Sequence, residues 1–513
     1  MDYDAIVIGS GMGGLSAASL LTQLYGRKVL ILEKHSRPGG FTHSFSRQGK
    51  FEWDVGVHYV GDMAPGSVLR KVMDRVTGSA VSWRKFRDPF QRFFYPGFTL
   101  EMPGDPKAYE ETLLQMFPDE RQGIERYFKL TRQALTWERS RLIMSSLAPS
   151  WFRRLARWAL AKRADLAYQS TRDFLSGLSP SRELQCILDA QWGTYGIPPA
   201  QSPMLWNAMI FWHYARGAYY PLGGAGELAK AAVGIVQAGG GDVLLQSEVI
   251  EVLISDGAAH GVRVRSIRSG ETTEYRSPLI ISDIGARATY AKFLKNHPSQ
   301  TREDVAAAPM ASSTVTVYLG LKESPEKIGI HGENLWIADG IDHDRSWEER
   351  NHAFEGKPVM AFVSFASQNG FMLKGHTAQI VAPMDYELFA PWAGKGWRQR
   401  GEDYERRKAL IAEGLIAFVD KRVPGLRDLI AYSEVSTPLT IEHFTSHPMG
   451  QIYGIPAVLG RKEWAWISPE TPLKGLYLTG ADVIAGGVTA AMLGGVITLA
   501  RIFGFSVFRK VFF

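Results

Sequence analysis

A glycine-rich turn and an acid near the N-terminus have the spacing of a dinucleotide-binding site. Residues 9–14 read G-S-G-M-G-G, and Glu33 lies 24 residues after the first glycine. Such a turn brings backbone N–H groups at a helix N-terminus close to a pyrophosphate, while the acid accepts hydrogen bonds from ribose hydroxyls and repels a 2′-phosphate. The glycines that we expect to contact the cofactor are Gly9, Gly11, Gly13 and Gly14.

The segments around this turn fit a β–α–β unit. Residues 4–8 form a short apolar run typical of a strand buried in a parallel sheet, residues 15–24 have helical composition, and residues 28–32 form a second apolar run that ends at Glu33. Glycines alone would be weak evidence, but strand, glycines, helix, strand and acid in this order are strong evidence. We therefore predict a Rossmann-type unit at the N-terminus.

Composition bounds the remaining possibilities. The chain has 513 residues, 45% hydrophobic and 21% charged, with a net charge of +6, which is typical of a mildly basic globular protein of two or three domains. Its single cysteine, Cys186, excludes an intramolecular disulfide and a cysteine-based metal centre. The first predicted strand starts so early that we expect no targeting segment. Residues 483–500 carry no charge, but their four glycines and two threonines favour a buried helix over a membrane span.

The segments after Glu33 indicate which dinucleotide is bound. Residues 34–40 read K-H-S-R-P-G-G and residues 51–61 read F-E-W-D-V-G-V-H-Y-V-G. Both resemble the amine-oxidase and phytoene-desaturase superfamily of flavoproteins, in which a Gly-Gly pair lies against FAD and a D-x-G segment follows. The resemblance implies FAD as the cofactor. The matching residues are Gly39, Gly40, Asp54 and Gly56, and we also expect Lys34, which follows Glu33, to contact the cofactor.

Later segments extend this resemblance to the middle and the end of the chain. Residues 219–228 contain a P-x-G-G-like turn that enters a helix, and strand-like runs follow at 242–245, 248–252 and 280–283. At the C-terminal end, residues 475–482 resemble a strand and turn, and a helix opens within residues 486–491. Such a helix N-terminus stabilises negative charge on a reduced flavin. The residues that the resemblance places against FAD are Val249, Gly480, Asp482, Gly487, Val488 and Thr489.

Four segments are most similar to retinol saturase and its bacterial relatives, neighbours of carotenoid isomerase. They are residues 38–45, 54–61, 213–224 and 476–482, with a looser match at 447–454. Phe41 stands where a small residue or cysteine is expected, and Met449 stands where an arginine is expected. The resemblance implies saturation of one carbon–carbon double bond in a polyene or isoprenoid lipid. Desaturation and cis–trans isomerisation would use the same site.

Saturation needs an acid beside the substrate. The candidate proton donors are His58, Tyr59, His213 and Tyr219, which lie in segments expected near the flavin. His58 could instead satisfy a buried backbone carbonyl. No second G-x-G-x-x-G follows a strand, so we expect an external electron donor. Other hypotheses are a flavin amine oxidase and a non-catalytic prenyl-lipid escort protein, although Glu33 and residues 487–489 argue against the escort.

We also predict contact with a membrane surface. Residues 151–159 place tryptophan and phenylalanine on one helical face and arginines on the other, a pattern that suits a membrane surface or a domain-packing helix. The aromatic and basic tail at residues 503–513 would need lipid, a partner subunit or its own core to cover it. We expect a cytoplasmic protein that attaches peripherally to the membrane. The aromatic run at 192–220 fits either a polyene slot or core.

The expected fold class is α/β, with a Rossmann-type FAD-binding domain assembled from discontinuous segments, a mixed-sheet substrate domain and a helical, membrane-facing subdomain. We assign 1–75, 218–290 and 440–505 to the FAD-binding domain. Residues 76–105 and 291–439 form the substrate-binding domain, residues 106–217 the helical subdomain, and residues 506–513 the tail. We see no metal-binding or nucleic-acid-binding motif.

Overall fold

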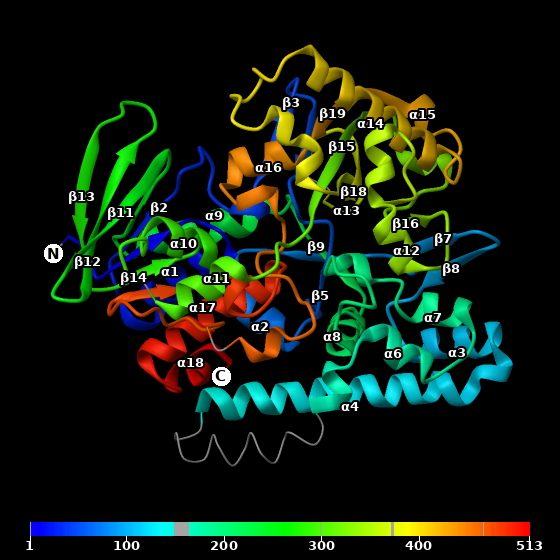
Figure 1. Ribbon diagram of the computed structural model, residues 1–513, viewed down its shortest axis with the longest axis horizontal. Helices are drawn as coiled ribbons and strands as arrows, with labels where there is room; N and C mark the ends of the chain where they lie inside the picture. Colours follow the sequence, from blue (N-terminus) through cyan, green and yellow to red (C-terminus); the bar gives the residue numbers. More distant parts are fainter. Residues whose placement is uncertain (1, 148–163, 298, 371–373, 465, 513) are drawn as a thin grey trace.

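Five parallel strands form one sheet in the computed structural model, which describes residues 2–147, 164–297, 299–370, 374–464 and 466–512. The strand order is β10-β2-β1-β14-β20, so segments from both ends and the middle of the chain lie side by side (Figure 1). All residues of β1 and β2 are buried, as expected where both faces of a parallel sheet are covered. The strands are β1 (Ala5–Ile8), β2 (Val29–Leu32), β10 (Asp242–Leu244), β14 (Ile280–Ser282) and β20 (Leu476–Leu478).

Helix α1 (Met12–Tyr25) packs against both α9 (Gly226–Ala238) and α17 (Val488–Phe503). The approach of α17 to α1 is so close that a Cβ on Gly495 would lie 2.7 Å from the Cβ of Ser16. The glycines of the uncharged C-terminal stretch therefore permit helix packing inside the cofactor half. Within the described part of the chain, no helix has the length and apolarity needed to cross a membrane.

A seven-stranded mixed sheet forms the second half of the molecule, at the upper right of Figure 1. Its order is β19-β15-β18-β17-β16-β7-β8, and only β16 and β7 pair in parallel. Helix α14 (Glu402–Asp420) buries Ile411 and Leu415 in the same hydrophobic core as β15, β17 and β18. The strands are β7 (Gln91–Tyr95), β8 (Phe98–Met102), β15 (Ser313–Leu321), β16 (Asn334–Ala338), β17 (Met360–Ser364), β18 (His376–Met384) and β19 (Ile430–Ser436).

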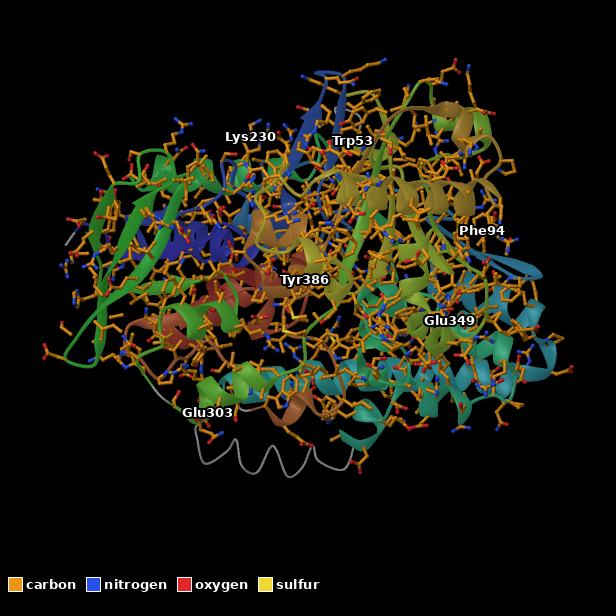
Figure 2. The ribbon with its side chains drawn as sticks, turned by 45° about the horizontal axis from the view of Figure 1, so that its top comes forward. Trp53, Phe94, Lys230, Glu303, Glu349 and Tyr386 are labelled. Atoms are coloured by element: carbon orange, nitrogen blue, oxygen red, sulfur yellow. The ribbon has the colours of Figure 1, made fainter. Side chains whose placement is uncertain are left out.

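The hairpin of β3 (Ser44–Arg47) and β4 (Phe51–Asp54) connects the two halves. The fully buried Trp53, labelled in Figure 2, donates its indole N–H to the carbonyl of Leu319 in β15 at 3.1 Å. The Gln379 amide in β18 donates to the backbone carbonyl of Asp54 at 2.9 Å. These contacts hold the mixed sheet in place relative to the glycine-rich turn.

Helices dominate the region between residues 106 and 213, as the sequence predicts. Tyr109, Tyr127 and Phe211 form an aromatic cluster between them, with ring centroids 5.8 Å apart for both pairs that involve Phe211. The predicted basic helix at 151–159 lies outside the described residues. The helices are α3 (Pro106–Met116), α4 (Arg121–Leu147), α6 (Thr171–Ser176), α7 (Arg182–Leu188) and α8 (Met204–His213).

The C-terminal tail forms helix α18 (Ser506–Phe512), which packs on α17 and on α2 (Val68–Val76). Val507 and Val511 are buried there. Lys510 lies over the ring of Tyr25 at 4.3 Å. One face of the tail therefore meets the protein's own core, whereas Phe505, just before the helix, is 56% exposed.

Two smaller sheets and several short helices complete the fold. The antiparallel strands β11, β12 and β13 form the arm at the left of Figure 1, and β9 pairs with β5 and β6. The domain boundaries given above stay a prediction. The strands are β5 (Val60–Gly61), β6 (Trp83–Lys85), β9 (Ala218–Pro221), β11 (Ser247–Ser255), β12 (Ala258–Ser266) and β13 (Thr272–Arg276). The helices are α10 (Ala286–Lys292), α11 (Gln300–Ala307), α12 (His343–Glu348), α13 (Ala366–Gly370), α15 (Leu426–Leu429) and α16 (Pro438–Thr445).

Candidate functional site

A cavity of about 1790 Å³ begins at the carboxyl ends of the parallel strands and continues beneath the mixed sheet. Ligands of open α/β sheets bind at this edge. Most of the predicted cofactor residues line the cavity, although they come from six separate segments. They are Gly9, Gly11, Glu33, Lys34, Gly39, Gly40, Val249, Asp482, Gly487, Val488 and Thr489.

The remaining predicted glycines lie beneath the cavity wall and set the spacing between two loops. A Cβ on Gly13 would overlap the Cα of Gly480 and would lie 2.5 Å from Oδ1 of Asp283. Gly9 has a φ of +93°, which a side chain would disfavour. Helix α1 begins directly after Gly11 without a side-chain cap from the described residues, so its first N–H groups are available to an anion.

Glu33 is held at the end of β2 by three donors. The backbone N–H and hydroxyl of Ser10 reach its Oε2 at 2.9 and 2.5 Å, and the N–H of His35 reaches Oε1 at 2.6 Å. The neighbouring Lys34 donates to the hydroxyl of Ser446 at 2.8 Å. These contacts fix the acid at the wall of the cavity, where a ribose would need it.

Asp482 and the start of α17 form the opposite wall. The Asp482 carboxylate accepts the N–H of Ala286 at 2.6 Å and the N–H of Ile455 at 2.7 Å, so it ties three loops together. Gly487 has a φ of +98° and precedes the first residue of α17. The positive end of this 16-residue helix therefore lies at the cavity.

Asp54 does not line the cavity. Its buried carboxyl accepts the N–H of Ala225 and the hydroxyl of Ser44, both at 2.8 Å, and a short hydrogen bond from the Tyr220 hydroxyl. Burial raises the pKa of Asp54 to about 6, and these donors oppose the shift. Asp54 therefore fixes β4 to the turn before α9, while Gly56 of the same motif lines the cavity.

His58 and Tyr59 lie in the part of the cavity that aromatic rings enclose. The His58 Nδ1 lies 2.7 Å from the hydroxyl of Ser364, and burial lowers the pKa of His58 to about 4. The Tyr59 hydroxyl lies 3.3 Å from Oε1 of Gln91, and burial raises the pKa of Tyr59 to about 12. The surrounding rings belong to Trp192, Tyr214, Trp336, Phe362 and Tyr453.

His213 lines the cavity but its ring is engaged elsewhere. Its Nε2 accepts the N–H of Gly61 at 3.0 Å, so a neutral ring carries its proton on Nδ1. Burial lowers the pKa of His213 to about 4, which keeps the ring neutral. Tyr219 does not line the cavity, and Tyr214 lies in the wall instead.

Comparison with known proteins identifies the family. A model described as "NAD(P)-binding Rossmann-like domain" matches residues 7–76. An all-trans-retinol 13,14-reductase of Danio rerio is 30% identical over 98% of this chain and 86% of its own length. The chain belongs to the all-trans-retinol 13,14-reductase family. A chloroplastic prolycopene isomerase 1 of an Oncidium hybrid cultivar is 26% identical over 98% of this chain and 84% of its own. The structure of cyclohexylamine oxidase from Brevibacterium oxydans shares the fold at 15% identity, with a TM-score of 0.61 over the full length of both chains.

Membership of the retinol-reductase family makes this chain an FAD-dependent oxidoreductase, as the resemblance predicts. The residues present fit FAD, because two glycine-containing loops meet at the N-terminus of α1, where a Cβ on Gly13 would overlap Gly480, and two well-oriented acids, Glu33 and Asp482, flank it. A single small ligand typically occupies about 300–1,000 Å³, so this cavity also has room for a second molecule.

The sequence predicts the strand run at 280–283 near the nucleotide but gives no role to its last residue, Asp283, and it does not predict the cavity residues of the mixed sheet. Asp283 follows β14 and lies against the glycine-rich turn, and Ser364, Trp336 and Phe362 come from the mixed sheet. Of the two departures from the family pattern, Phe41 lines the cavity beside the ring of His447, at a centroid distance of 5.6 Å. Met449 adopts a φ of +55° in a tight turn.

Proposed function

We propose that this chain reduces one carbon–carbon double bond of a polyene or isoprenoid lipid. The observation that carries the proposal is the continuity of the cavity, in which the glycine-rich turn and the aromatic enclosure around His58 belong to one space. A dinucleotide and an extended apolar molecule can therefore meet end to end. The name of the retinol-reductase relative supports reduction as the direction.

The roles of the protein follow from the chemistry that FAD supplies. The glycine-rich turn, Glu33 and Asp482 would hold FAD, which, once reduced by an external donor, would supply hydride to the substrate. The aromatic walls around Trp336 and Phe362 exclude water and orient an apolar chain. His58 supplies the proton to the substrate carbon, oriented by the hydroxyl of Ser364. Tyr59 is the second candidate, because its phenol keeps its proton throughout the neutral range.

The test is anaerobic. The yellow holoprotein is photoreduced, all-trans-retinol or prolycopene is added, and the visible flavin absorbance and the product mass are followed. We expect the flavin to reoxidise while the product gains two hydrogens. Reduction of the oxidised flavin by amines but not by polyenes, with release of hydrogen peroxide when air is admitted, would establish an amine oxidase. A colourless protein that binds prenyl lipids would establish an escort.

A second candidate function is cis–trans isomerisation, which the prolycopene isomerase relative favours. In the same experiment, isomerisation would change the geometry of the polyene at constant mass and leave the flavin reduced. The two outcomes are therefore separated by mass alone.

We also infer peripheral attachment to the membrane through the C-terminal helix. Phe508 and Phe512 of α18 line the same cavity as the flavin site, and Phe505 stands exposed beside them. The exposed Arg509 follows Phe508, which suits an anionic lipid surface. A lipid substrate could then enter the cavity from the bilayer.

Replacing Phe505 and Phe508 with serine is expected to weaken binding to anionic vesicles by about tenfold or more, since burial of one phenylalanine contributes about 1.5–3 kcal/mol. Co-sedimentation with vesicles measures the effect. These point variants are preferable to deleting 506–513, because Val507 and Val511 are core residues. Ile267→Ser is the matched control, since Ile267 is 45% exposed between β12 and β13. Equal binding by both variants would remove α18 from the proposal.

A further inference from the structure

Three carboxyl groups lie at the cofactor end of the cavity, and only two of them are well satisfied. Glu33 accepts three hydrogen bonds and Asp482 accepts two backbone N–H groups. Asp283 differs, because its Oδ2 is fully buried and accepts no well-formed hydrogen bond from any described residue. A buried carboxylate oxygen that accepts no well-formed hydrogen bond is costly when the group is ionised and much less so when it is neutral.

Asp283 lies directly against the glycine-rich turn. A Cβ added to Gly11 would lie 2.6 Å from its Oδ2, and one added to Gly13 would lie 2.5 Å from its Oδ1. This turn is the part of the fold that holds a pyrophosphate. The carboxyl therefore stands where FAD would bring two further negative charges.

The charges around Asp283 also favour its neutral form. Burial raises the pKa of Asp283 to about 7; the N–H groups of Gly14 and Gly11 oppose this rise, and Glu33 and Asp482 add to it. From α10, Arg287 faces Asp482 but donates to the carbonyls of Ala306 and Pro309. His447 also faces Asp482, and burial lowers its pKa, so it adds no compensating positive charge at neutral pH.

We propose that Asp283 is protonated when FAD is bound, so that FAD binding takes up a proton from solvent. The proposal rests on the assignment of FAD to this cavity. The proton bound to Asp283 removes one of the negative charges that would otherwise repel the pyrophosphate. Because the bound state prefers the protonated carboxyl, proton binding and FAD binding strengthen each other. The affinity for FAD must then fall as the pH rises and Asp283 ionises in the FAD-free protein.

The experiment is an FAD titration of the full-length, deflavinated protein, followed by flavin fluorescence at several pH values. We expect the dissociation constant of the wild type to rise by about tenfold or more between about pH 6 and about pH 9. Asp283→Asn is neutral and of the same shape, so its affinity should exceed that of the wild type at alkaline pH and should not change with pH.

Glu33→Gln is the matched control at the same site. It should weaken FAD binding overall, because a ribose contact is lost, and should keep the pH dependence with its midpoint moved to lower pH, because one negative charge near Asp283 is gone. Calorimetry in two buffers of different ionisation enthalpy should detect proton uptake by the wild type and none by Asp283→Asn. An affinity of the wild type that is constant with pH would overturn the protonation of Asp283. Failure of the wild type to bind FAD at every pH would overturn the cofactor site itself.

Discussion

Gly13→Ala is expected to yield a purified protein without bound FAD. The added Cβ would overlap the Cα of Gly480 and press on the Asp283 carboxyl, and neither backbone loop can rotate away as a flexible side chain could. The two loops that form the cofactor end would have to separate. We expect the flavin absorbance of the purified protein to fall by about tenfold or more, since overpacking of this kind typically costs about 1–3 kcal/mol.

Gly234→Ala is the matched control for this variant. Gly234 also lies inside a helix, α9, but its Cβ would meet no atom within 4 Å. Alanine is favoured over glycine in a helix interior by about 0.5–1 kcal/mol, so this variant should keep its flavin and melt slightly higher. If Gly13→Ala retained FAD as Gly234→Ala does, the two loops would not be closely packed in solution.

The cofactor half was predictable because its evidence is local. The spacing from Gly9 to Glu33 specifies one β–α–β unit, whose strands and helix form within about three residues of the expected bounds. The C-terminal strand and helix were identified through the resemblance of residues 475–491. The apolar runs at residues 313–319 and 359–366 are typical of buried strands, and they form most of β15 and β17.

The aromatic run at 192–220 supplies Trp192 and Tyr214 to the cavity wall, but the part of the wall that comes from the mixed sheet was not predictable, because it depends on long-range pairing. Trp336 and Phe362 meet at a centroid distance of 4.6 Å only after β16 pairs with β17 on one side and with β7 on the other. No spacing in the sequence marks them. The surroundings of the Asp283 carboxyl were not predictable for the same reason, because loops that follow β1, β14 and β20 together enclose it.

The two histidines show why residue type alone does not assign a role. Both side chains line the cavity, and burial lowers the pKa of both. However, His213 accepts a hydrogen bond from a backbone N–H, whereas His58 forms a hydrogen bond with a side-chain hydroxyl. The partner Gly61 is 152 residues away from His213 in sequence.

The environment of the C-terminal tail could not be chosen from the sequence either, which allowed lipid, a partner subunit or the protein's own core. The burial of Val507 shows that one face of the tail packs on the protein's own core.

His58→Ala is expected to keep FAD bound and to lower the rate of double-bond reduction by about hundredfold, the usual contribution of a positioned acid. Ser364→Ala should have a smaller effect, because it leaves the imidazole in place and removes only its orienting hydroxyl. Single-turnover reoxidation of photoreduced flavin measures both rates, and the visible spectrum reports bound FAD. His213→Ala is the contrasting variant, since it leaves the Gly61 N–H unsatisfied and should destabilise the fold by about 1–3 kcal/mol.

The pH dependence separates His58 from Tyr59. Because the pKa of His58 in the folded protein is about 4, its protonated fraction falls by about tenfold for each pH unit above that value. If His58 is the acid, the rate rises as the pH is lowered from about 8 to about 6, and His58→Ala loses this rise. If Tyr59 is the acid, the rate is constant over this range, because burial raises the pKa of Tyr59 to about 12. Tyr59→Phe would then abolish turnover while His58→Ala retains it, which would transfer the proton-donating role from the imidazole to the phenol.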